Sequence, residues 1–563
     1  MAEKRNCQDL HLIIIPPPFQ GHINPSIHLS LKLAAKGFII TFVNTHSTHN
    51  QITKSRKLDD VFAGARESGF DIRYATISDG FPLTFDRLLN REQFMEGRIH
   101  VLPAHVDELV GNLMGSDLPP TCLVVDTFST WGCTIAKKYG LVYISLWTQP
   151  ALVLSLFYHL DLLKENGHYG SNEGRYENMD NIDYVPGVGA IKPSDLISFL
   201  QETDTTKVIH RVIDKAFKDV KKADFIICNT VEELEPEPIS VLKQKQPTYA
   251  VGPLFPSLFE QLLVEMNLWS ESECSQWLDS KPRGSVLYAS FGSYARINRK
   301  RIREIANGLM LSEVNFIWVL RPDIVSSEVT DFLPDGFREN VRNRGLVLPW
   351  CKQNAVLSHS AVGGFLTHCG WNSILESIWF GVPMICFPLM GDQMTNRKLV
   401  VDDWKIGINL CDGELVSSSE VAKKVKDFMS GVSFGDLKKE VEEIRLKLEN
   451  ALLSNGSSQT NFDKFVEDVK GKIGKHKITR NLQSSSSGPD TRNGSLQLLH
   501  CTLCCTDVYF MSVAFNALSS QLVPVDKLPD RLHSAGGSTL LMITSLITRL
   551  MASRLIQERT HLS

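Results

Sequence analysis

The sequence predicts an α/β protein with two similar parallel-sheet domains, and three observations support this. Short apolar runs rich in β-branched residues alternate with longer amphipathic stretches, the pattern of strands joined by crossover helices. The series of runs begins again after a weakly patterned stretch near the middle of the chain. The 563 residues, 43% of them apolar, exceed one ordinary domain and can fill more than one core.

The first domain is placed at residues 1–251 and has four clear strands. These cover residues 12–15, 39–43, 121–125 and 141–146, and a helical stretch at 129–139 separates the last two. Residues 252–273 carry prolines and exposed-type side chains, which predicts a linker. The second domain, at 274–473, has predicted strands at 285–290, 315–320, 345–348, 363–367 and 384–387. Its last helix is predicted to pack back on the first domain.

Residues 474–563 differ in character and are predicted to form a largely disordered tail that is not a third domain. The segment is rich in serine, threonine and leucine and lacks clear periodicity. Cys501, Cys504 and Cys505 beside His500 superficially suggest zinc, but no second ligand pair at finger spacing accompanies them. The apolar run at 538–550 is too short to span a bilayer.

Charge and cysteine usage exclude several classes. The formal charge is −4, with 59 basic and 63 acidic side chains and no long run of either sign, so binding to nucleic acid or an anionic membrane is not expected. The apolar run at 12–15 is too short for a signal peptide core or a membrane span. Cysteines outside the tail are scattered singly, which suits reduced thiols. We therefore expect a cytoplasmic protein, and we expect it to be a monomer.

The strand ends of the first domain carry a candidate catalytic pair. Ligands of parallel sheets sit outside the carboxyl ends of strands, so residues that follow strands deserve most weight. His22 follows the first strand, where Asn24 is predicted to cap a helix whose first residue is Pro25. A neutral histidine there can accept a proton. Asp126 follows the strand at 121–125 and could orient His22 and stabilise its imidazolium form.

Structural interpretations of both residues remain open. A single histidine near a helix start is more often a structural hydrogen-bonding group, and an aspartate at a strand end is usually a cap. The pairing of His22 with Asp126 is what favours catalysis.

The second domain carries a candidate anion site. Ser293 follows the strand at 285–290, in a turn whose backbone N–H groups could approach a phosphate. The strand at 363–367 leads through glycine into a helix, at whose amino end Asn372 and Ser373 can donate to phosphate oxygens. Glu376 lies on the same face and can accept from ribose hydroxyls. The alternative is a capping box, which Ser373-x-x-Glu376 also fits.

The window from Trp350 to Gln393 resembles the signature of plant family-1 UDP-glycosyltransferases. The residues that carry the resemblance are Trp350, Gln353, the block His368-Cys369-Gly370-Trp371-Asn372-Ser373, Glu376, Gly381-Val382-Pro383 and Asp392-Gln393. It extends to the segment around His22 and to Asp126, and covers about residues 8–473. Lys352 stands where the family usually has proline, which puts the local loop shape in question.

The resemblance implies a GT-B fold, in which two Rossmann-like domains face a cleft. The amino half would hold the acceptor and the carboxyl half the UDP-sugar. Trp350 would stack on uracil, Gln353 and Glu376 would contact the nucleoside, and His368, Asn372, Ser373 and Ser293 would hold the diphosphate. Trp371, Asp392, Gln393 and Thr148 would grip the sugar, and Gln393 resembles members that use UDP-glucose.

These residues together predict an inverting transferase that moves a sugar, glucose, from a UDP-sugar to a hydroxyl of a small apolar acceptor. His22 is the base and Asp126 its support. No cofactor or metal is expected, because helix dipole and side-chain donors can bind the diphosphate and no Asp-x-Asp is found. The acceptor is predicted to be a phenolic, flavonoid, terpenoid or hormone, against Phe19, Phe81, Phe85, Trp147 and Phe157. For any single one of these aromatic residues, a place in the core is the more frequent alternative.

Two other classes stay open. An NAD-dependent oxidoreductase would share the α/β layout, but this sequence has no Gly-x-Gly-x-x-Gly after an early strand. A non-catalytic nucleotide-sugar-binding protein could retain the same donor site, but retention of both His22 and Asp126 disfavours it.

Overall fold

The structure is a computed structural model. It describes residues 10–56, 61–170, 181–255, 268–325, 332–411, 413, 415–431 and 434–486. Residues 256–267 of the predicted linker lie outside this description, as do residues 487–563 of the predicted tail, with the cysteine cluster near His500.

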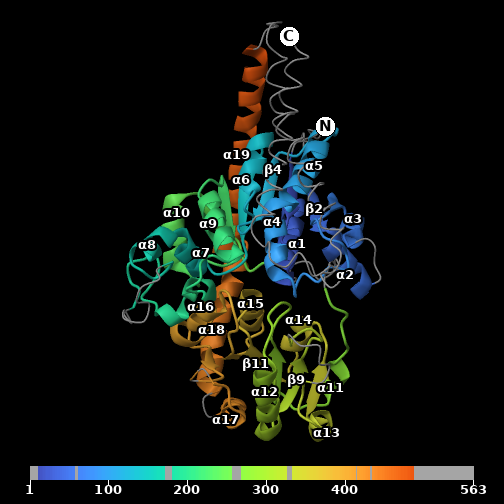
Figure 1. Ribbon diagram of the computed structural model, residues 1–563, viewed down its shortest axis with the longest axis vertical. Coiled ribbons are helices and arrows are strands. Elements are labelled where there is room, and N and C mark those ends of the chain that lie inside the picture. Colours follow the sequence, from blue (N-terminus) through green and yellow to red (C-terminus); the bar gives the residue numbers. More distant parts are fainter. Residues whose placement is uncertain are drawn as a thin grey trace, which may run out of the picture. The chain divides into compact units, whose positions relative to one another are not determined.

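The amino-terminal half is built on a parallel sheet of order β3-β2-β1-β4-β5-β6-β7 (Figure 1). Its strands are β1 (His11–Ile15), β2 (Ile39–Thr45), β3 (Ile72–Ile77), β4 (Cys122–Asp126), β5 (Val142–Trp147), β6 (Phe225–Cys228) and β7 (Thr248–Ala250). The four predicted strands are confirmed as β1, β2, β4 and β5. The sequence analysis missed β3, β6 and β7, because β3 is a partly exposed edge strand containing Arg73 and the other two are very short.

Helices cover both faces of this sheet because its strands alternate their side chains. Leu12 and Ile14 of β1 belong to one core, whereas Ile13 and Ile15 belong to another. The helices are α1 (Gln20–Ala35), α2 (His46–Arg56), α3 (Ala63–Glu67), α4 (Arg91–His100), α5 (Leu102–Met114), α6 (Gly132–Tyr139), α7 (Ala151–Tyr158), α8 (Leu160–Glu165), α9 (Val208–Val220) and α10 (Pro236–Lys245). The predicted helix between β4 and β5 is confirmed as α6.

The carboxyl-terminal half has a second parallel sheet, of order β10-β9-β8-β11-β12-β13. All five predicted strands are present, and β13 is additional; the strands are β8 (Val286–Ser290), β9 (Asn315–Val319), β10 (Gly345–Leu348), β11 (Val362–Thr367), β12 (Met384–Cys386) and β13 (Gly407–Asn409). The helices are α11 (Ser275–Asp279), α12 (Arg299–Ser312), α13 (Phe337–Val341), α14 (Gln353–Leu357), α15 (Trp371–Trp379), α16 (Gln393–Lys398), α17 (Ser418–Met429) and α18 (Phe434–Leu452).

The last helix among the described residues, α19 (Ser457–Ser486), contributes to the core of the amino-terminal half. Its buried apolar residues share a core with β1 and α1; they are Phe462, Phe465, Val466, Val469 and Ile473. Lys32 of α1 lies 4.6 Å from the centre of the Phe462 ring and donates to the Val251 carbonyl at 3.4 Å. Burial lowers the pKa of Lys32 to about 8. The helix continues to Ser486, beyond the end of the family resemblance near residue 473. The prediction of disorder from residue 474 is therefore wrong for residues 474–486, which are helical.

Glu235 shows how the first sheet holds the helix that follows β5. The carboxylate is 3% exposed and accepts from the backbone N–H groups of Ala151 and Leu152 at 2.9 and 2.8 Å, and from Thr230 Oγ1 at 2.6 Å. It therefore satisfies the free N–H groups at the start of α7. Burial raises the pKa of Glu235.

We expect Glu235→Ala to destabilise the protein by about 2–3 kcal/mol, because three buried donors lose their acceptor. Thermal unfolding followed by circular dichroism measures the effect. Glu237→Ala, which removes an exposed carboxylate from the same segment, is the matched control and should leave Tm nearly unchanged. Equal Tm values for the two variants would contradict this role of Glu235.

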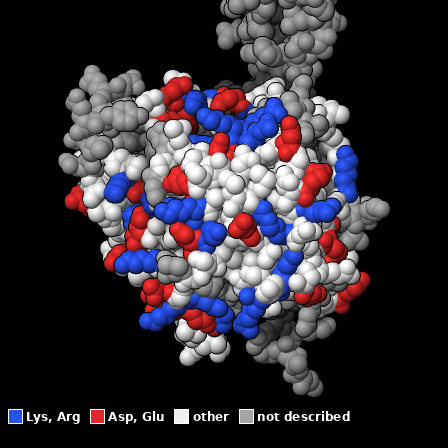
Figure 2. All heavy atoms as spheres, turned by 90° about the horizontal axis from the view of Figure 1, so that it is seen from below, with Lys and Arg blue, Asp and Glu red and all other residues white. Residues whose placement is uncertain are grey.

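The surface carries both charge signs. Lysine and arginine alternate with aspartate and glutamate across the face shown in Figure 2. Among the described helices, none is long and apolar enough to cross a membrane.

Candidate functional site

His22 and Asp126 meet at the carboxyl ends of β1 and β4. His22 Nδ1 lies 2.7 Å from Asp126 Oδ2, and Asp126 Oδ1 accepts from the Phe128 backbone N–H at 2.9 Å. Because a carboxylate can only accept, Nδ1 carries the hydrogen and Nε2 of the neutral ring keeps its lone pair. Asp126 is 2% exposed and His22 19%. The pair thus has the geometry of a base and its orienting carboxylate.

The predicted start of α1 was wrong. The helix begins at Gln20 with Phe19 at the N-cap, so His22 lies in its first turn, and Asn24 and Pro25 lie inside the helix. Asn24 Oδ1 instead accepts from Gln20 Nε2 at 2.9 Å. Asn24 was judged from its propensity at N-caps, which is overridden here by the tertiary contacts of the segment.

Pro25 leaves a carbonyl of the first turn free to bind across the two halves. Proline has no backbone N–H, so the Gly21 carbonyl has no partner one turn later in α1. It accepts instead from Asn372 Nδ2, at the start of α15, at 2.8 Å. Asn372 Oδ1 accepts from Asn229 Nδ2 at 3.2 Å, and Trp371 Nε1 donates to the Asn229 carbonyl at 2.7 Å. The sequence analysis missed Asn229, which has no local motif.

The turn after β8 and the start of α15 enclose the His368 ring. A Cβ atom on Gly292 or Gly370 would lie 2.4 or 2.5 Å from His368 Nε2, so only glycine leaves room for the ring. Gly292 also has φ of 71°. Burial, followed by the charge of Arg321, lowers the pKa of His368 to about 4. His368 is therefore a neutral donor beside Ser293 near pH 7.

Arg321 supports this turn and was missed. It lies shortly after β9 and is 0% exposed. It donates to the carbonyls of Gly292 and Ala295, the latter at 2.8 Å, and to Asp323 Oδ1 at 2.9 Å. The turn that could hold a phosphate is thus built on a buried guanidinium. An arginine beyond a strand end was the only sequence signal, and it is a weak one.

Gln353, Ser373 and Glu376 form one hydrogen-bonded group. Gln353 Nε2 donates to Glu376 Oε2 at 2.6 Å and to Ser373 Oγ at 3.0 Å, while Tyr288 donates to Gln353 Oε1 at 3.2 Å. The capping-box alternative is not observed, because Gly370 is the N-cap of α15 and no side chain caps it. Burial raises the pKa of Glu376 to about 7, partly offset by Gln353.

Trp350 lies beside this group in the loop between β10 and α14. Its backbone carbonyl accepts from the Ser272 N–H at 2.9 Å. Lys352, at the unusual position, has φ of −73°, which is within the range that proline fixes. The loop therefore keeps a backbone that proline would also adopt.

The four predicted sugar-gripping residues differ in their surroundings. Thr148 Oγ1 lies 3.0 Å from His22 Nδ1. Asp392 accepts from Asn396 at 2.7 Å, and burial raises the pKa of Asp392 to about 6. Trp371 is 3% exposed and bonded to Asn229. Gln393 Oε1 accepts from the backbone N–H groups of Leu389 and Met390 at 2.9 and 3.0 Å, so its carbonyl oxygen holds that loop.

One cavity of about 250 Å³ brings most of these residues together. Two of the predicted site residues, Asp126 and Gln393, are not in the wall of this cavity. The predicted residues in the wall are His22, Thr148, Ser293, Trp350, Gln353, His368, Trp371, Asn372, Ser373, Glu376 and Asp392. Both halves of the chain contribute, at the carboxyl ends of their strands. Among the residues that the structure describes, no group of three or more metal-ligating side chains is found.

A second cavity, of about 330 Å³, adjoins the first, since Gln20 and Ser293 line both. Its wall includes Phe19, Phe94 and Tyr294, and the Phe19 ring lies 4.9 Å from that of Tyr294. Among the aromatic residues predicted for the acceptor, Phe19 is in this wall.

Other members of that aromatic set fill the interior. Trp147 and Phe157 are each 1% exposed and pack with Phe128 and Phe217, so the core alternative is correct for both. Sequence alone does not separate core from pocket aromatics, because both are large and apolar.

Comparison with known proteins agrees with this architecture. Residues 269–441 match a family model described as UDP-glucoronosyl and UDP-glucosyl transferase. UDP-glycosyltransferase 86A1 of Arabidopsis thaliana is 54% identical over 479 residues, covering 84% of this chain and 96% of its own. The 7-deoxyloganetin glucosyltransferase of Gardenia jasminoides is 36% identical over 482 residues, covering 82% and 98%.

Solved structures show the same fold. The structure of Medicago truncatula UGT71G1 complexed with UDP-glucose superposes with a TM-score of 0.69 at 26% identity, covering 82% of this chain and 99% of that one. The two parallel sheets with a shared cavity are the GT-B arrangement. The chain belongs to the plant family-1 UDP-glycosyltransferases and is a UDP-glycosyltransferase with a GT-B fold.

Proposed function

We propose that the protein transfers glucose from UDP-glucose to a hydroxyl of a small apolar acceptor, with inversion at the anomeric carbon. The observation that carries this proposal is the 2.7 Å contact of His22 with Asp126, in a cavity whose opposite wall is the signature segment. The oxidoreductase and non-catalytic alternatives are not favoured by the family.

The donor roles follow from the chemistry of each wall. Trp350 stacks on uracil, and Gln353 and Glu376 bind the ribose. Diphosphate oxygens accept from Ser293, His368, Asn372 and Ser373, at the positive end of α15. Thr148, Trp371, Asp392 and Gln393 hold the sugar. We also propose that residues 1–251 bind the acceptor and 274–473 the donor, joined by 252–273.

The reaction needs a proton acceptor and a stabilised leaving group. The acceptor hydroxyl loses its proton to His22 Nε2 as its oxygen attacks the anomeric carbon from the face opposite the diphosphate. The bond from that carbon to the phosphate oxygen breaks, and UDP leaves with the electron pair. Asp126 stabilises the imidazolium, while α15 and the neighbouring donors stabilise the developing charge on UDP without a metal.

Relatives support the choice of donor and acceptor class. The Gardenia relative is named a glucosyltransferase acting on 7-deoxyloganetin, and the Medicago structure contains UDP-glucose. We place the acceptor in the second cavity, which adjoins the cavity lined by His22 and is partly aromatic. A cytoplasmic monomer stays our expectation for the state of the protein.

The direct test is acceptor-dependent release of UDP from UDP-glucose, with phenolic and terpenoid alcohols as acceptors. Release that requires an acceptor, with a glycoside detected by mass spectrometry, supports the transferase. UDP binding with no release for any acceptor would favour a non-catalytic binding protein. Failure of UDP to bind would remove the donor site itself.

Binding of UDP-glucose should weaken below about pH 7, where Glu376 becomes protonated. An ionised carboxylate accepts from ribose hydroxyls more strongly than a neutral one. The measurement covers about pH 5.5 to 8.5, a range in which UDP-glucose has no titrating group of its own. Calorimetry in the absence of acceptor measures the dissociation constant.

Glu376→Gln is the control for this pH dependence and should bind UDP-glucose weakly at all pH values.

The raised pKa of Glu376 has a second consequence, for the stability of the protein. A carboxyl with a raised pKa in the folded state contributes less stability as pH rises from its unfolded value toward about 7. In Glu376→Gln, the free energy of unfolding should therefore decline less over this pH range than in wild type. A pH profile of binding unchanged in Glu376→Gln would exclude Glu376 from ribose binding.

A further inference from the structure

Three cations without an ion-pair partner in the described part of the chain lie in the wall of the second cavity or beside aromatic rings that line it. Lys54 is in its wall, Arg91 lies 4.8 Å from the centre of the Tyr294 ring, and Arg98 lies 5.4 Å from the centre of the Phe19 ring. Within the part of the chain that the structure describes, none of these three forms an ion pair. The two rings, Phe19 and Tyr294, both line the cavity.

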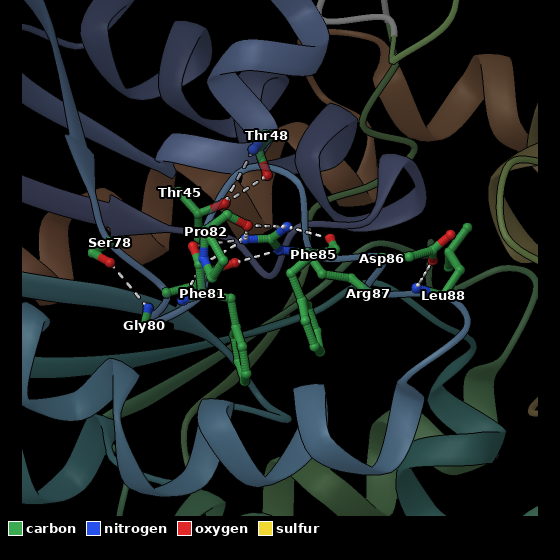
Figure 3. A network of polar contacts seen from close by, with 11 residues as sticks. Thr45, Thr48, Ser78, Gly80, Phe81, Pro82, Phe85, Asp86, Arg87 and Leu88 are labelled. Atoms are coloured by element: carbon green, nitrogen blue, oxygen red, sulfur yellow. Dashed lines mark hydrogen bonds and ion pairs between the residues drawn. The ribbon is translucent and has the colours of Figure 1, made fainter. Parts of the chain in front are cut away.

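The neighbouring charged groups are already engaged. Arg87 donates to both oxygens of Asp79, at 2.7 and 2.9 Å, and Figure 3 shows it among the carbonyls of Phe81, Pro82 and Phe85. Glu96 of α4 pairs with Arg211. Arg87 and Arg211 are therefore neutralised within the protein, whereas Lys54, Arg91 and Arg98 have no ion-pair partner among the described residues.

Of these cations, Arg98 is expected to destabilise the free protein most. Its Nε is buried and has no hydrogen-bond partner among the described residues, while one Nη donates only to the weak acceptor Met95 Sδ at 3.4 Å. Burial lowers the pKa of Arg98, and the negative charge of Asp126 acts in the opposite direction. A guanidinium held in this way destabilises the free protein unless an anion meets it.

The position of Arg98 relative to His22 suggests which kind of anion would pair with Arg98. The Phe19 ring contacts both groups, lying 5.4 Å from the Arg98 guanidinium and 6.0 Å from the His22 ring. An acceptor that packs against Phe19 can therefore present one end to His22 and another to Arg98. Aromatic hydroxy acids have these two ends on one flat scaffold.

We propose that the acceptor carries a carboxylate, which ion-pairs with Arg98 while its hydroxyl is glycosylated at His22. This inference rests on the proposed function and names the acceptor class within it. Arg98 is a specificity residue that binds the acceptor. Bidentate pairing of guanidinium with carboxylate is among the stronger polar contacts, and its loss lowers affinity by about 10- to 100-fold.

The test compares matched acceptors on the full-length protein. Hydroxybenzoic and hydroxycinnamic acids are each paired with their methyl esters, and kcat and KM are measured from UDP release with UDP-glucose. Wild-type protein should favour the acids by about 10- to 100-fold in kcat/KM. Arg98→Gln and Arg98→Met should lose this preference through a raised KM for the acids, with little change for the esters. Arg98→Lys should keep part of it.

Arg338→Gln is the matched control, because it removes an exposed arginine from α13. It should behave as wild type. Thermal unfolding supplies a readout that a structural role would not give: Arg98→Met should raise Tm, because a buried unpaired charge is replaced by an apolar side chain.

The other outcomes overturn the inference. Equal losses for acid and ester would make Arg98 a support for Asp126, and a lowered Tm with equal losses would make it structural. A base-labile ester product would place the carboxylate at His22. Where neither member of a pair reacts, calorimetry with bound UDP should show tighter binding of the acid, and equal or absent binding overturns the inference. Failure to bind UDP would count against the proposed function instead.

Discussion

His22→Ala is expected to lower turnover by about 10²- to 10⁴-fold, while the affinity for UDP-glucose stays close to that of wild type. The imidazole is the group in this wall whose free nitrogen can take the proton of an acceptor hydroxyl. The imidazole does not support the turn after β8 that we propose for the diphosphate, because that turn belongs to the other half of the chain. Steady-state UDP release and calorimetry measure the two quantities.

His46→Ala serves as the matched control, because His46 is exposed at the start of α2. It should retain full turnover. Asp126→Asn should resemble His22→Ala, since an amide does not hold the same tautomer as a carboxylate. Near-normal turnover in His22→Ala would remove His22 from the role of base.

Arg321→Met should have the largest effect on the carboxyl-terminal half. Removing the guanidinium leaves Asp323 and the carbonyls of Gly292 and Ala295 without their donor, which typically costs about 3–5 kcal/mol for a buried charge network. The turn beside His368 then loses its support. We expect a lowered Tm and UDP affinity reduced by about 10- to 100-fold.

Arg342→Met, which removes an exposed arginine, is the control for this variant. Arg321→Lys should recover little, because an ammonium cannot reach the three acceptors in the directions that a planar guanidinium does. A wild-type Tm in Arg321→Met would show that the turn is held by other contacts.

The sequence predicted the site best where chemistry follows a strand. His22, Asp126 and Ser293 were selected because parallel strands bring their carboxyl ends to one edge, and His368 because of the family resemblance. The structure brings His22, Ser293 and His368 to one cavity, with Asp126 in contact with His22. It predicted poorly where a residue acts through a distant partner. The Asn229 carbonyl accepts from the Trp371 indole, and Arg321 donates to the Ala295 carbonyl; such contacts between distant segments leave no local pattern.

Propensity also misled in two places. Asn24 has the chemistry of an N-cap, yet α1 begins earlier, because the backbone around Phe19 already turns into the helix. Edge strands such as β3 are half exposed and so lack the continuous apolar run by which buried parallel strands are recognised. In both cases the deciding information is tertiary.

The packing of α19 sets an order on biosynthesis. The apolar face of α1 and β1 is completed by residues of this last helix, so it stays uncovered while the entire carboxyl-terminal sheet is translated. At about 5–20 residues per second this interval lasts many seconds. The nascent amino-terminal half must therefore wait, with Phe38 and its apolar neighbours accessible to chaperones, until the ribosome delivers the segment that closes its core.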